Sequence, residues 1–347
     1  MKRFLILLFC FLSLSLSAQD YNVLFIGNSY TSYNNLPQLV QDVLGDSHGN
    51  YHMSSSTPGG CNFQNHLTQS FSYIKQGGWD YVILQDQSQA PSFPDSQFME
   101  ETYPYAQQLC DSVRKYSPNA QIIFYMTWGR QNGDSYNCQF FPPLCTYEGM
   151  DSLLYLRYMI MAEDNEAAVS PVGALWHYIR DNYPDINLYQ SDESHPALVG
   201  SYAAACSFYT LLTHDNPVNI TANCGVNIEQ AEIIRNCAKI VVYDSLNKWL
   251  FPTVIIPFGV EDIEDNSLLT IYPNPTSQTL FIEMSSLELP SYDVKIYDIN
   301  GILCGQFLNN KETISNFDIS FLNSGMYFFV VSSYDKQQIA AKKFLKK

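Results

Sequence analysis

The sequence predicts an α/β domain, with a parallel sheet between two layers of helices, followed by a smaller all-β sandwich. Between Asn22 and Trp249, short apolar runs alternate with longer amphipathic segments. Strands that are apolar on both faces and separated by helices indicate a parallel sheet covered on both sides. After about residue 267 the pattern changes to period-two alternation, which is typical of strands with one buried face. At 347 residues, with 46% hydrophobic and 15% charged residues, the chain can form two globular domains.

The elements of the first domain follow from apolar periodicity. Five segments are expected to be strands of the parallel sheet: 22–27, 51–56, 80–85, 120–128 and 167–173. Seven segments are expected to be helical: 36–45, 62–76, 95–117, 147–164, 173–183, 196–213 and 228–248. In such sheets ligands bind beyond the carboxyl ends of the strands, so the loops that start at Gly27, Thr57, Gln85 and Trp128 are the candidate site loops.

The second domain is expected at 267–347, after a first domain at 19–258 and an acidic linker at 259–266. Four segments in it alternate with period two: LFIEM, YDVKIYDI, MYFFVVSS and IAAKKF. Asn300-Gly301 lies where a tight hairpin turn is expected. These features predict a small β-sandwich.

Residues 1–18 are typical of a cleaved secretory signal peptide. Lys2 and Arg3 precede a mostly apolar run from Phe4 to Leu16, and small residues follow at Ser17 and Ala18. That run is shorter than the roughly 20 residues needed to span a bilayer, and no later stretch reaches this length. We therefore expect an exported protein without a transmembrane segment.

Export permits disulfides, and eight of the nine cysteines lie beyond the signal peptide. Cys138 and Cys145 flank a short loop that contains proline, and Cys224 and Cys237 are thirteen residues apart. These two pairs are the predicted bridges, and buried free thiols are the alternative. No Cys or His spacing indicates a metal site, and no cofactor is expected.

The charge of the first domain excludes two classes of partner. Residues 19–266 hold 27 acidic and 9 basic residues. Such a surface repels phosphate backbones and anionic lipid headgroups, so nucleic acid and membrane surfaces are not expected partners.

Two short motifs offer the parts of a nucleophilic site. Gly27-Asn28-Ser29 follows the first expected strand and presents a hydroxyl at the carboxyl edge of the sheet, although alone it is usually only a turn. Asp192 precedes His195 by three residues, so its carboxylate can reach the imidazole Nδ1–H and leave Nε2 to act as a base. The alternative for this second motif is a helix cap with a surface histidine.

Two further loops offer donors for a developing oxyanion. Gly59-Gly60 follows the second strand, where glycines let a backbone N–H approach closely. Gln85-Asp86-Gln87-Ser88 follows the third strand and offers side-chain amides. Each loop alone is more simply a turn or a polar loop, but four loops with suitable groups at one sheet edge favour a site.

Taken together, these residues resemble the SGNH or GDSL hydrolases, esterases with a flavodoxin-like sheet, over nearly all of residues 22–214. The resemblance implies Ser29 as nucleophile, Asp192 and His195 as its partners, and an oxyanion hole made by Ser29, Gly60 and Gln87. Gln87 departs from the family, which has asparagine at this place, and Asn28 replaces the usual aspartate. Three residues are expected near the site as substrate contacts, with packing or a surface ion pair as the alternative: Tyr30, Trp128 and Arg130.

The end of the chain resembles a C-terminal sorting domain of type IX secretion. The resemblance lies in IYPNPTSQTLFIE, VKIYDINGILC, LNSGMYFFVV and the basic tail KKFLKK. It implies the secretion machinery as a partner and export through a Gram-negative outer membrane, to the medium or the cell surface. The alternative is an ordinary accessory β-sandwich that binds sugars.

Two hypotheses follow for the function. The first is an exported serine esterase that removes an acyl group, with an acetyl ester on a carbohydrate as the substrate that the resemblance favours. The second is a surface-displayed glycan-binding protein with an inactive pocket, and the altered third loop motivates it. A pure binder needs neither a base nor an acid to orient it, so the combination of Ser29, Asp192 and His195 favours the esterase.

Overall fold

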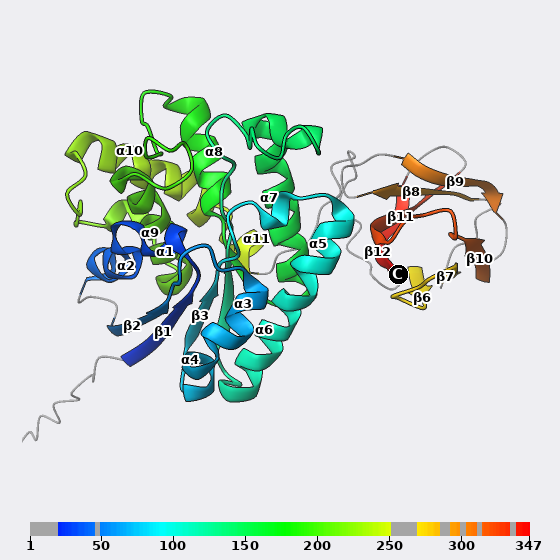
Figure 1. Cartoon of the computed structure of the whole chain (residues 1–347), viewed down its shortest axis with the longest axis horizontal. Coiled ribbons are helices and arrows are strands. Elements are labelled where there is room, and N and C mark those ends of the chain that lie inside the picture. The colour runs from blue at the N-terminus through cyan, green and yellow to red at the C-terminus, as the bar shows by residue number, and fades with distance from the viewer. Residues whose placement is uncertain are drawn as a thin grey trace, which may run out of the picture.

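The computed structural model describes residues 20–45, 49–250, 269–284, 292–298, 303–310, 314–333 and 338–347. It contains a larger α/β domain and a smaller all-β domain (Figure 1). The expected signal peptide at 1–18, the linker at 259–266 and the Asn300-Gly301 turn lie outside the described residues.

A five-stranded parallel sheet forms the centre of the first domain, in the order β2-β1-β3-β4-β5. Its strands are β1 (Asp20–Ile26), β2 (Asn50–Ser56), β3 (Tyr81–Leu84), β4 (Gln121–Tyr125) and β5 (Ala168–Ser170). All five expected strands are present, although β4 and β5 are shorter than predicted. The strand order is the flavodoxin-like one, with its switch between β1 and β3, and it confirms the predicted fold class.

Helices cover the sheet in two layers. On one side α6 contacts α3, α4 and α7, and on the other α9 contacts α2, α8 and α10 (Figure 1). The bounds in the first layer are α3 (Phe63–Gln69), α4 (Phe71–Gln76), α5 (Asp95–Glu101), α6 (Tyr103–Tyr116) and α7 (Tyr147–Asp164). Those in the second are α2 (Leu36–Leu44), α8 (Val172–Asn182), α9 (Leu198–Thr213) and α10 (Ile228–Ala238), followed by a π-helical turn (Lys239–Tyr243) and α11 (Leu246–Leu250).

Three expected helices are divided. The segment 228–248 forms α10, the π-helical turn and α11, and two other segments each form two helices. The segment 62–76 breaks at Ser70, whose Oγ donates to Ser56 Oγ at 2.8 Å rather than capping α4. The segment 95–117 breaks at Thr102, just before Pro104 in the first turn of α6. Proline has no N–H to donate and its ring clashes with the preceding turn, so it is tolerated only near a helix start.

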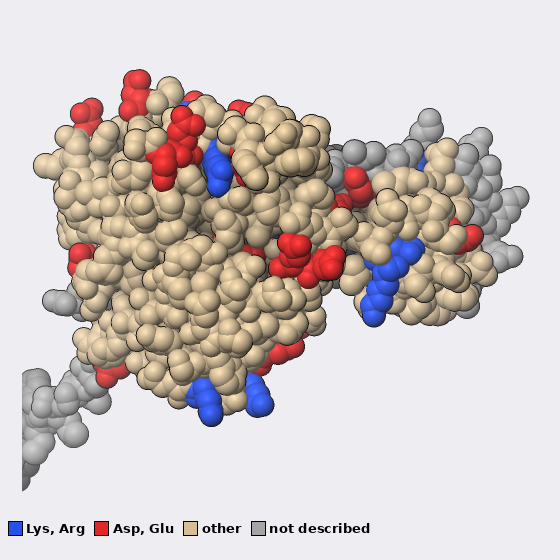
Figure 2. All heavy atoms as spheres, in the orientation of Figure 1, with Lys and Arg blue, Asp and Glu red and all other residues tan. Residues whose placement is uncertain are grey.

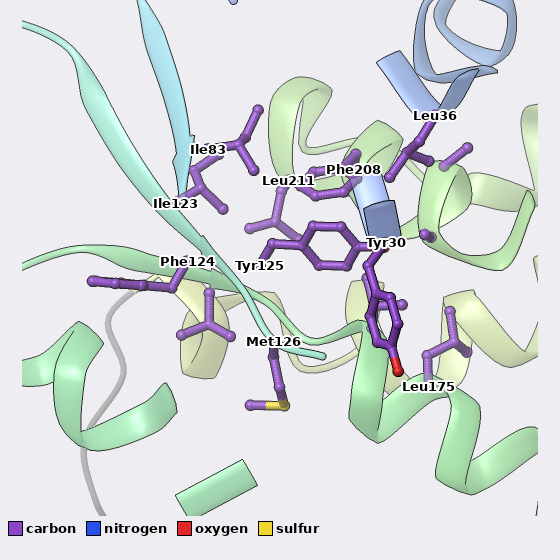
Figure 3. Packing of buried hydrophobic residues seen from close by; sticks show 14 of the residues in the cluster. Tyr30, Leu36, Ile83, Ile123, Phe124, Tyr125, Met126, Leu175, Phe208 and Leu211 are labelled. Carbon is purple, nitrogen blue, oxygen red and sulfur yellow. The ribbon is translucent and has the colours of Figure 1, made fainter. Parts of the chain in front are cut away.

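The core between sheet and helices continues up to the carboxyl edge of the strands. Tyr125, the last residue of β4, lies between Phe208 of α9 and Tyr30 (Figure 3). The rings of Tyr125 and Phe208 pack edge to face, with centroids 5.1 Å apart. Aromatic pairs of this kind add to the free energy gained from burial. The loops at this edge are therefore based on densely packed, buried side chains.

The second domain is a β-sandwich, as predicted. One sheet has the order β10-β7-β6 and the other β12-β11-β8-β9, with antiparallel pairing throughout. The strands are β6 (Leu269–Tyr272), β7 (Thr279–Met284), β8 (Tyr292–Asp298), β9 (Leu303–Asn310), β10 (Ile314–Asp318), β11 (Gly325–Ser333) and β12 (Gln338–Lys346). Alternate residues of both sheets, such as Ile282, Val294 and Phe329, form its separate core.

One predicted disulfide is present and the other is wrong. Cys138 and Cys145 are bonded, with their Cα atoms 4.6 Å apart. Cys224 and Cys237 are free thiols. Cys237 is buried in the core on α10, whereas Cys224 lies in the preceding loop in left-handed backbone, near Cys206. Sequence spacing alone did not show that the two thiols lie in different surroundings.

The surface agrees with the charge of the sequence. Acidic side chains are spread over the face of the first domain that Figure 2 shows. Among the described residues, no helix has the length and apolar character required to cross a bilayer.

Candidate active site

Ser29 lies directly beyond the carboxyl end of β1, at the start of the short helix α1 (Ser29–Ser32). Asn28 caps this helix, because its Oδ1 accepts from Tyr30 N at 3.1 Å. A Cβ at Gly27 would lie 2.4 Å from Thr31 Oγ1 and 2.6 Å from Gln85 Oε1. Only glycine fits this position, and the tight turn places Ser29 at the edge of the sheet.

The buried side chain of Gln85 holds this turn in place. Its Oε1 accepts from Asn28 N at 3.0 Å and from Thr31 Oγ1 at 2.8 Å, and its Nε2 donates to Asn28 Oδ1 at 3.0 Å. Gln85 is fully buried, so these bonds satisfy its amide in the core. The sequence identified Gln85 as part of a polar loop, but its partner loop became evident only in three dimensions.

Ser29, His195 and Asp192 form a connected chain of hydrogen bonds. Ser29 Oγ lies 2.8 Å from His195 Nε2, and His195 Nδ1 lies 2.5 Å from Asp192 Oδ2. The side chain of His195 is 25% exposed and that of Asp192 is 46% exposed. These residues come together although 166 positions separate Ser29 from His195.

Backbone donors fix Asp192 in this chain. Its Oδ1 accepts from the N–H groups of Ser194 at 3.0 Å and of His195 at 2.9 Å. Burial by itself raises the pKa of Asp192, but the hydrogen bonds from the His195 ring and from these two N–H groups lower it more. The net result is a pKa below the ordinary value. Asp192 is therefore ionised at neutral pH and can orient the imidazole.

Tyr30 and Trp128 support the loop that carries His195. Tyr30 Oη lies 2.7 Å from Ser194 Oγ, and Trp128 Nε1 donates to Ser194 O at 3.1 Å. The two rings stack at 4.6 Å, and Trp128 stacks in turn on Trp176 at 3.8 Å. Trp128 is fully buried and Tyr30 is 2% exposed, which argues against their predicted contact with substrate. They lie next to the site as predicted, but as packed supports.

Arg130 also lies near the site, where it connects two loops. Its Nη1 is 3.2 Å from Asp134 Oδ1 and its Nη2 donates to Gln89 Oε1 at 2.5 Å. The Asp134 side chain is fully buried and that of Arg130 is 29% exposed. This geometry corresponds to the ion pair that the sequence left open as the alternative to substrate binding.

The backbone N–H groups of Ser29 and Gly60 remain available on two adjoining loops. No hydrogen bond between described residues uses the N–H of Ser29 or that of Gly60. Gly60 has φ +71°, a conformation that favours glycine, and a Cβ there would meet open space. Asn28 Nδ2 donates to Cys61 O at 2.9 Å, so the glycine loop is joined to the serine loop.

The side chain of Gln87 curls back over its own loop. Its Oε1 accepts from Gln89 N at 2.9 Å and from Ala90 N at 3.0 Å. Its Nε2 makes only long contacts, 3.4 Å to Ser88 Oγ and 3.3 Å to Gln89 Oε1. These contacts exceed the usual length of about 2.9 Å, so the amide retains the capacity to donate elsewhere.

Asp86 connects the glycine loop with the Gln87 loop, a role that the sequence did not indicate. Its Oδ1 accepts from Phe63 N at 2.7 Å and from Gln87 N at 2.8 Å. Its Oδ2 has no hydrogen-bond partner among the described residues. Burial raises the pKa of Asp86 to about 7, partly offset by the backbone donors of Gln87 and Phe63.

A second histidine–carboxylate pair lacks a nucleophile. His177 Nδ1 lies 2.8 Å from Asp151 Oδ2, and its Nε2 lies 3.3 Å from Asp181 Oδ2. Hydrogen bonding to Asp151 is the main cause that raises the pKa of His177. Both ring nitrogens face carboxylates, so this histidine is not placed to deprotonate a hydroxyl.

A family model matches the C-terminal part of the chain. Residues 270–347 match the family model of the secretion system C-terminal sorting domain. No curated protein matches the sequence.

Solved structures show the fold of the first domain. A DUF4886 family protein from Bacteroides uniformis has a TM-score of 0.53 and 16% identity, over 66% of this chain and 95% of that chain. A putative SGNH hydrolase from Slackia heliotrinireducens has a TM-score of 0.47 and 22% identity, over 57% and 100%. An acetylxylan esterase from Geobacillus stearothermophilus has a TM-score of 0.41 and 14% identity, over 54% and 92%. The chain thus carries a secretion system sorting domain that directs it through the outer membrane, behind an α/β domain with the fold of the DUF4886 family protein.

Proposed function

We propose that this protein is an exported serine esterase that hydrolyses an acyl ester by a Ser-His-Asp mechanism. The observation that carries the proposal is the unbroken hydrogen-bond chain from Ser29 Oγ through the His195 ring to Asp192. Ser29 at the carboxyl edge of the sheet and an imidazole within hydrogen-bond reach are the arrangement that activates a serine nucleophile.

In the first half of the reaction Ser29 Oγ attacks the acyl carbonyl carbon while His195 Nε2 accepts the hydroxyl proton. The tetrahedral intermediate collapses when His195 returns that proton to the leaving alcohol, and an acyl-serine remains. In the second half, water loses a proton to His195 and attacks the acyl carbon. Ser29 then recovers the proton and the carboxylic acid leaves. Asp192 stays ionised and stabilises the imidazolium in both halves.

The negative charge on the carbonyl oxygen needs fixed donors. The N–H groups of Ser29 and Gly60 serve this purpose, because both are free of other hydrogen bonds between described residues. The Gln87 amide adds a third donor in a rotamer that gives up its long Nε2 contacts and also the bonds that Oε1 accepts from Gln89 N and Ala90 N. Asp86 holds the Gly60 and Gln87 loops together through Phe63 N and Gln87 N.

For the substrate we propose an acetyl ester on a carbohydrate. Asp192 and His195 are partly exposed, which is compatible with a bulky alcohol such as a sugar polymer at the surface. The sorting domain directs the protein out of the cell, where extracellular glycans occur, and this supports the choice. The resemblance to esterases of the SGNH class favours the same choice.

The test is hydrolysis of p-nitrophenyl acetate, butyrate and octanoate by the full mature chain and by Ser29→Ala. Ser32→Ala is the matched control, because Ser32 is an exposed serine on the same short helix. We expect activity that decreases with acyl length, is lost in Ser29→Ala and is retained in Ser32→Ala. Equal rates for Ser29→Ala and the unmodified protein would overturn the proposal.

A further inference from the structure

The segment Tyr33-Asn34-Asn35, just after the helix that carries Ser29, has an unusual backbone. Asn34 has φ 54° and ψ 17°, and Asn35 has φ 51° and ψ 58°. Two consecutive residues other than glycine in left-handed backbone are uncommon, and asparagine tolerates this region better than most residues. Such a conformation persists where surrounding contacts hold it.

The contacts that hold it reach the loop of the proposed base. Asn34 Nδ2 donates to Pro196 O at 3.0 Å and to Ser201 Oγ at 2.9 Å. Pro196 directly follows His195, and Ser201 is buried in α9. The amide of Asn34 therefore joins the loop of the proposed nucleophile to the far side of the His195 loop.

The neighbouring residue contacts the imidazole itself. The ring of Tyr33 stacks on the ring of His195, with centroids 4.3 Å apart and planes inclined by 19°. Tyr30 approaches the same imidazole edge to face at 5.4 Å. Tyr33 is 38% exposed, so its ring lies at the surface and not in the core. The stacked ring covers one face of the imidazole. Stacked and edge-on rings together restrict rotation of the imidazole.

We propose that Tyr33 and Asn34 form a positioning device that keeps His195 Nε2 aligned with Ser29 Oγ. This inference rests on the proposed function. Tyr33 and Asn34 are positioning residues, because both act through the imidazole. Only three residues separate Ser29 from Tyr33, so one short segment fixes both the hydroxyl and the base that must meet it. Catalysis by proximity depends on this alignment, and a misplacement of about 1 Å can cost a factor of about 100.

The first test compares Asn34→Gly with Asn35→Gly. Glycine relieves the strain of the left-handed backbone at both positions. Of the two residues, only Asn34 has a side-chain bond to the His195 loop, through Pro196 O. Asn35 is exposed, and its side chain makes no capping bond to α2. With p-nitrophenyl acetate we expect kcat to fall about 10- to 100-fold in Asn34→Gly with KM changed less than about 2-fold. Asn35→Gly should keep both constants. Equal losses in the two variants would overturn the proposal.

A second readout does not depend on turnover. The proton between His195 Nδ1 and Asp192 should give a slowly exchanging downfield NMR resonance. A His195→Gln variant assigns it and distinguishes it from the corresponding His177 proton. We expect this resonance in the unmodified protein and in Asn35→Gly, and its broadening or loss in Asn34→Gly. Its absence from the unmodified protein, or its persistence in Asn34→Gly, would overturn the proposal. If the resonance behaves as expected and no ester is hydrolysed, the device stands and the proposed function fails.

The stacked ring is tested by Tyr33→Phe and Tyr33→Leu. Phenylalanine retains the stack, so Tyr33→Phe should keep kcat within about 2-fold of the unmodified protein. Tyr33→Leu should lower kcat with little effect on KM. The same loss in both variants would assign the effect to the tyrosine hydroxyl and contradict the role of stacking.

Discussion

The indole N–H of Trp128 donates to the carbonyl oxygen of Ser194, the residue immediately before His195. Trp128 follows β4, so the central sheet supports the histidine loop through this bond. The neighbouring Trp176 stacks on Trp128 and is equally buried, but its own Nε1 has no hydrogen-bond partner among the described residues. Two buried, stacked tryptophans therefore differ in one hydrogen bond, which makes them a natural pair for comparison.

Trp128→Phe should destabilise the protein more than Trp176→Phe. Both changes remove similar volume from the core, but only the first leaves the Ser194 carbonyl without its donor. A buried acceptor that loses its partner costs about 1–3 kcal/mol, and Ser194 is half-buried, so the lower end of this range is expected. Urea denaturation of both variants measures the difference. Trp128→Phe should also lower kcat, because the turn before His195 loses its support. Equal stability of the two variants would contradict this role of the indole N–H.

Asp192→Asn should lower kcat by a factor of up to about 10⁴ while the fold is retained. The amide leaves the imidazole in the wrong tautomer, and a loss of this size accompanies the equivalent change in serine proteases. Glu193→Gln is the control, because it removes a neighbouring exposed negative charge without touching the ring. Steady-state kinetics on p-nitrophenyl acetate checks both variants. A comparable loss in Glu193→Gln would indicate a general charge effect instead of orientation by Asp192.

Asp86→Asn should gain stability relative to the unmodified protein as the pH rises. The folded-state pKa of about 7 lies above the ordinary value of about 4, so folding is favoured by the protonated carboxyl. This contribution is complete below about pH 4 and is lost as the pH rises through about 7. Asparagine cannot ionise and can still accept from Phe63 N and Gln87 N.

Thermal and urea unfolding of both proteins at pH 5 and pH 8 tests this prediction. The unfolding free energy of Asp86→Asn, relative to that of the unmodified protein, should increase by about 2 kcal/mol between pH 5 and pH 8. Other titrating groups are common to both proteins and cancel in the comparison. A difference that does not depend on pH would show that Asp86 ionises as freely in the folded protein as in the unfolded chain.

A thiol count should show whether one or both of the disulfides expected from the sequence form. Among the described residues Cys138 and Cys145 are bonded to each other, and six cysteines lie outside any disulfide: Cys61, Cys110, Cys206, Cys224, Cys237 and Cys304. We therefore expect six reactive thiols per mature chain in denaturant before reduction and eight after it. Four thiols before reduction would show that a second disulfide forms. Peptide mapping would then identify the two cysteines and show whether they are Cys224 and Cys237.

Much of the fold and of the candidate site could be predicted from local pattern. Apolar runs separated by amphipathic segments are enough to indicate a parallel sheet, because a strand covered on both faces must be apolar on both. The turn at Gly27 and the three-residue step from Asp192 to His195 depend on neighbours in the sequence, so their spacing already indicates which atoms can meet. Helix breaks were missed at Ser70 and Thr102. At Ser70 the side chain bonds Ser56, which is distant in the sequence, and after Thr102 a proline begins a new helix.

Contacts between loops distant in the sequence were decided only by the tertiary structure. The order of the strands brings distant segments together. As a result Trp128 is buried, Asn34 bonds Pro196, and Asp86 bonds Phe63. The free Cys224 and Cys237 show the same limit, because a bridge depends on where two side chains point and not on how many residues separate them. The sequence by itself determined which chemical groups follow each strand. The packing of the sheet and helices determined which of those groups meet, because the distances between loops are set by strand order and core contacts rather than by the chain between them.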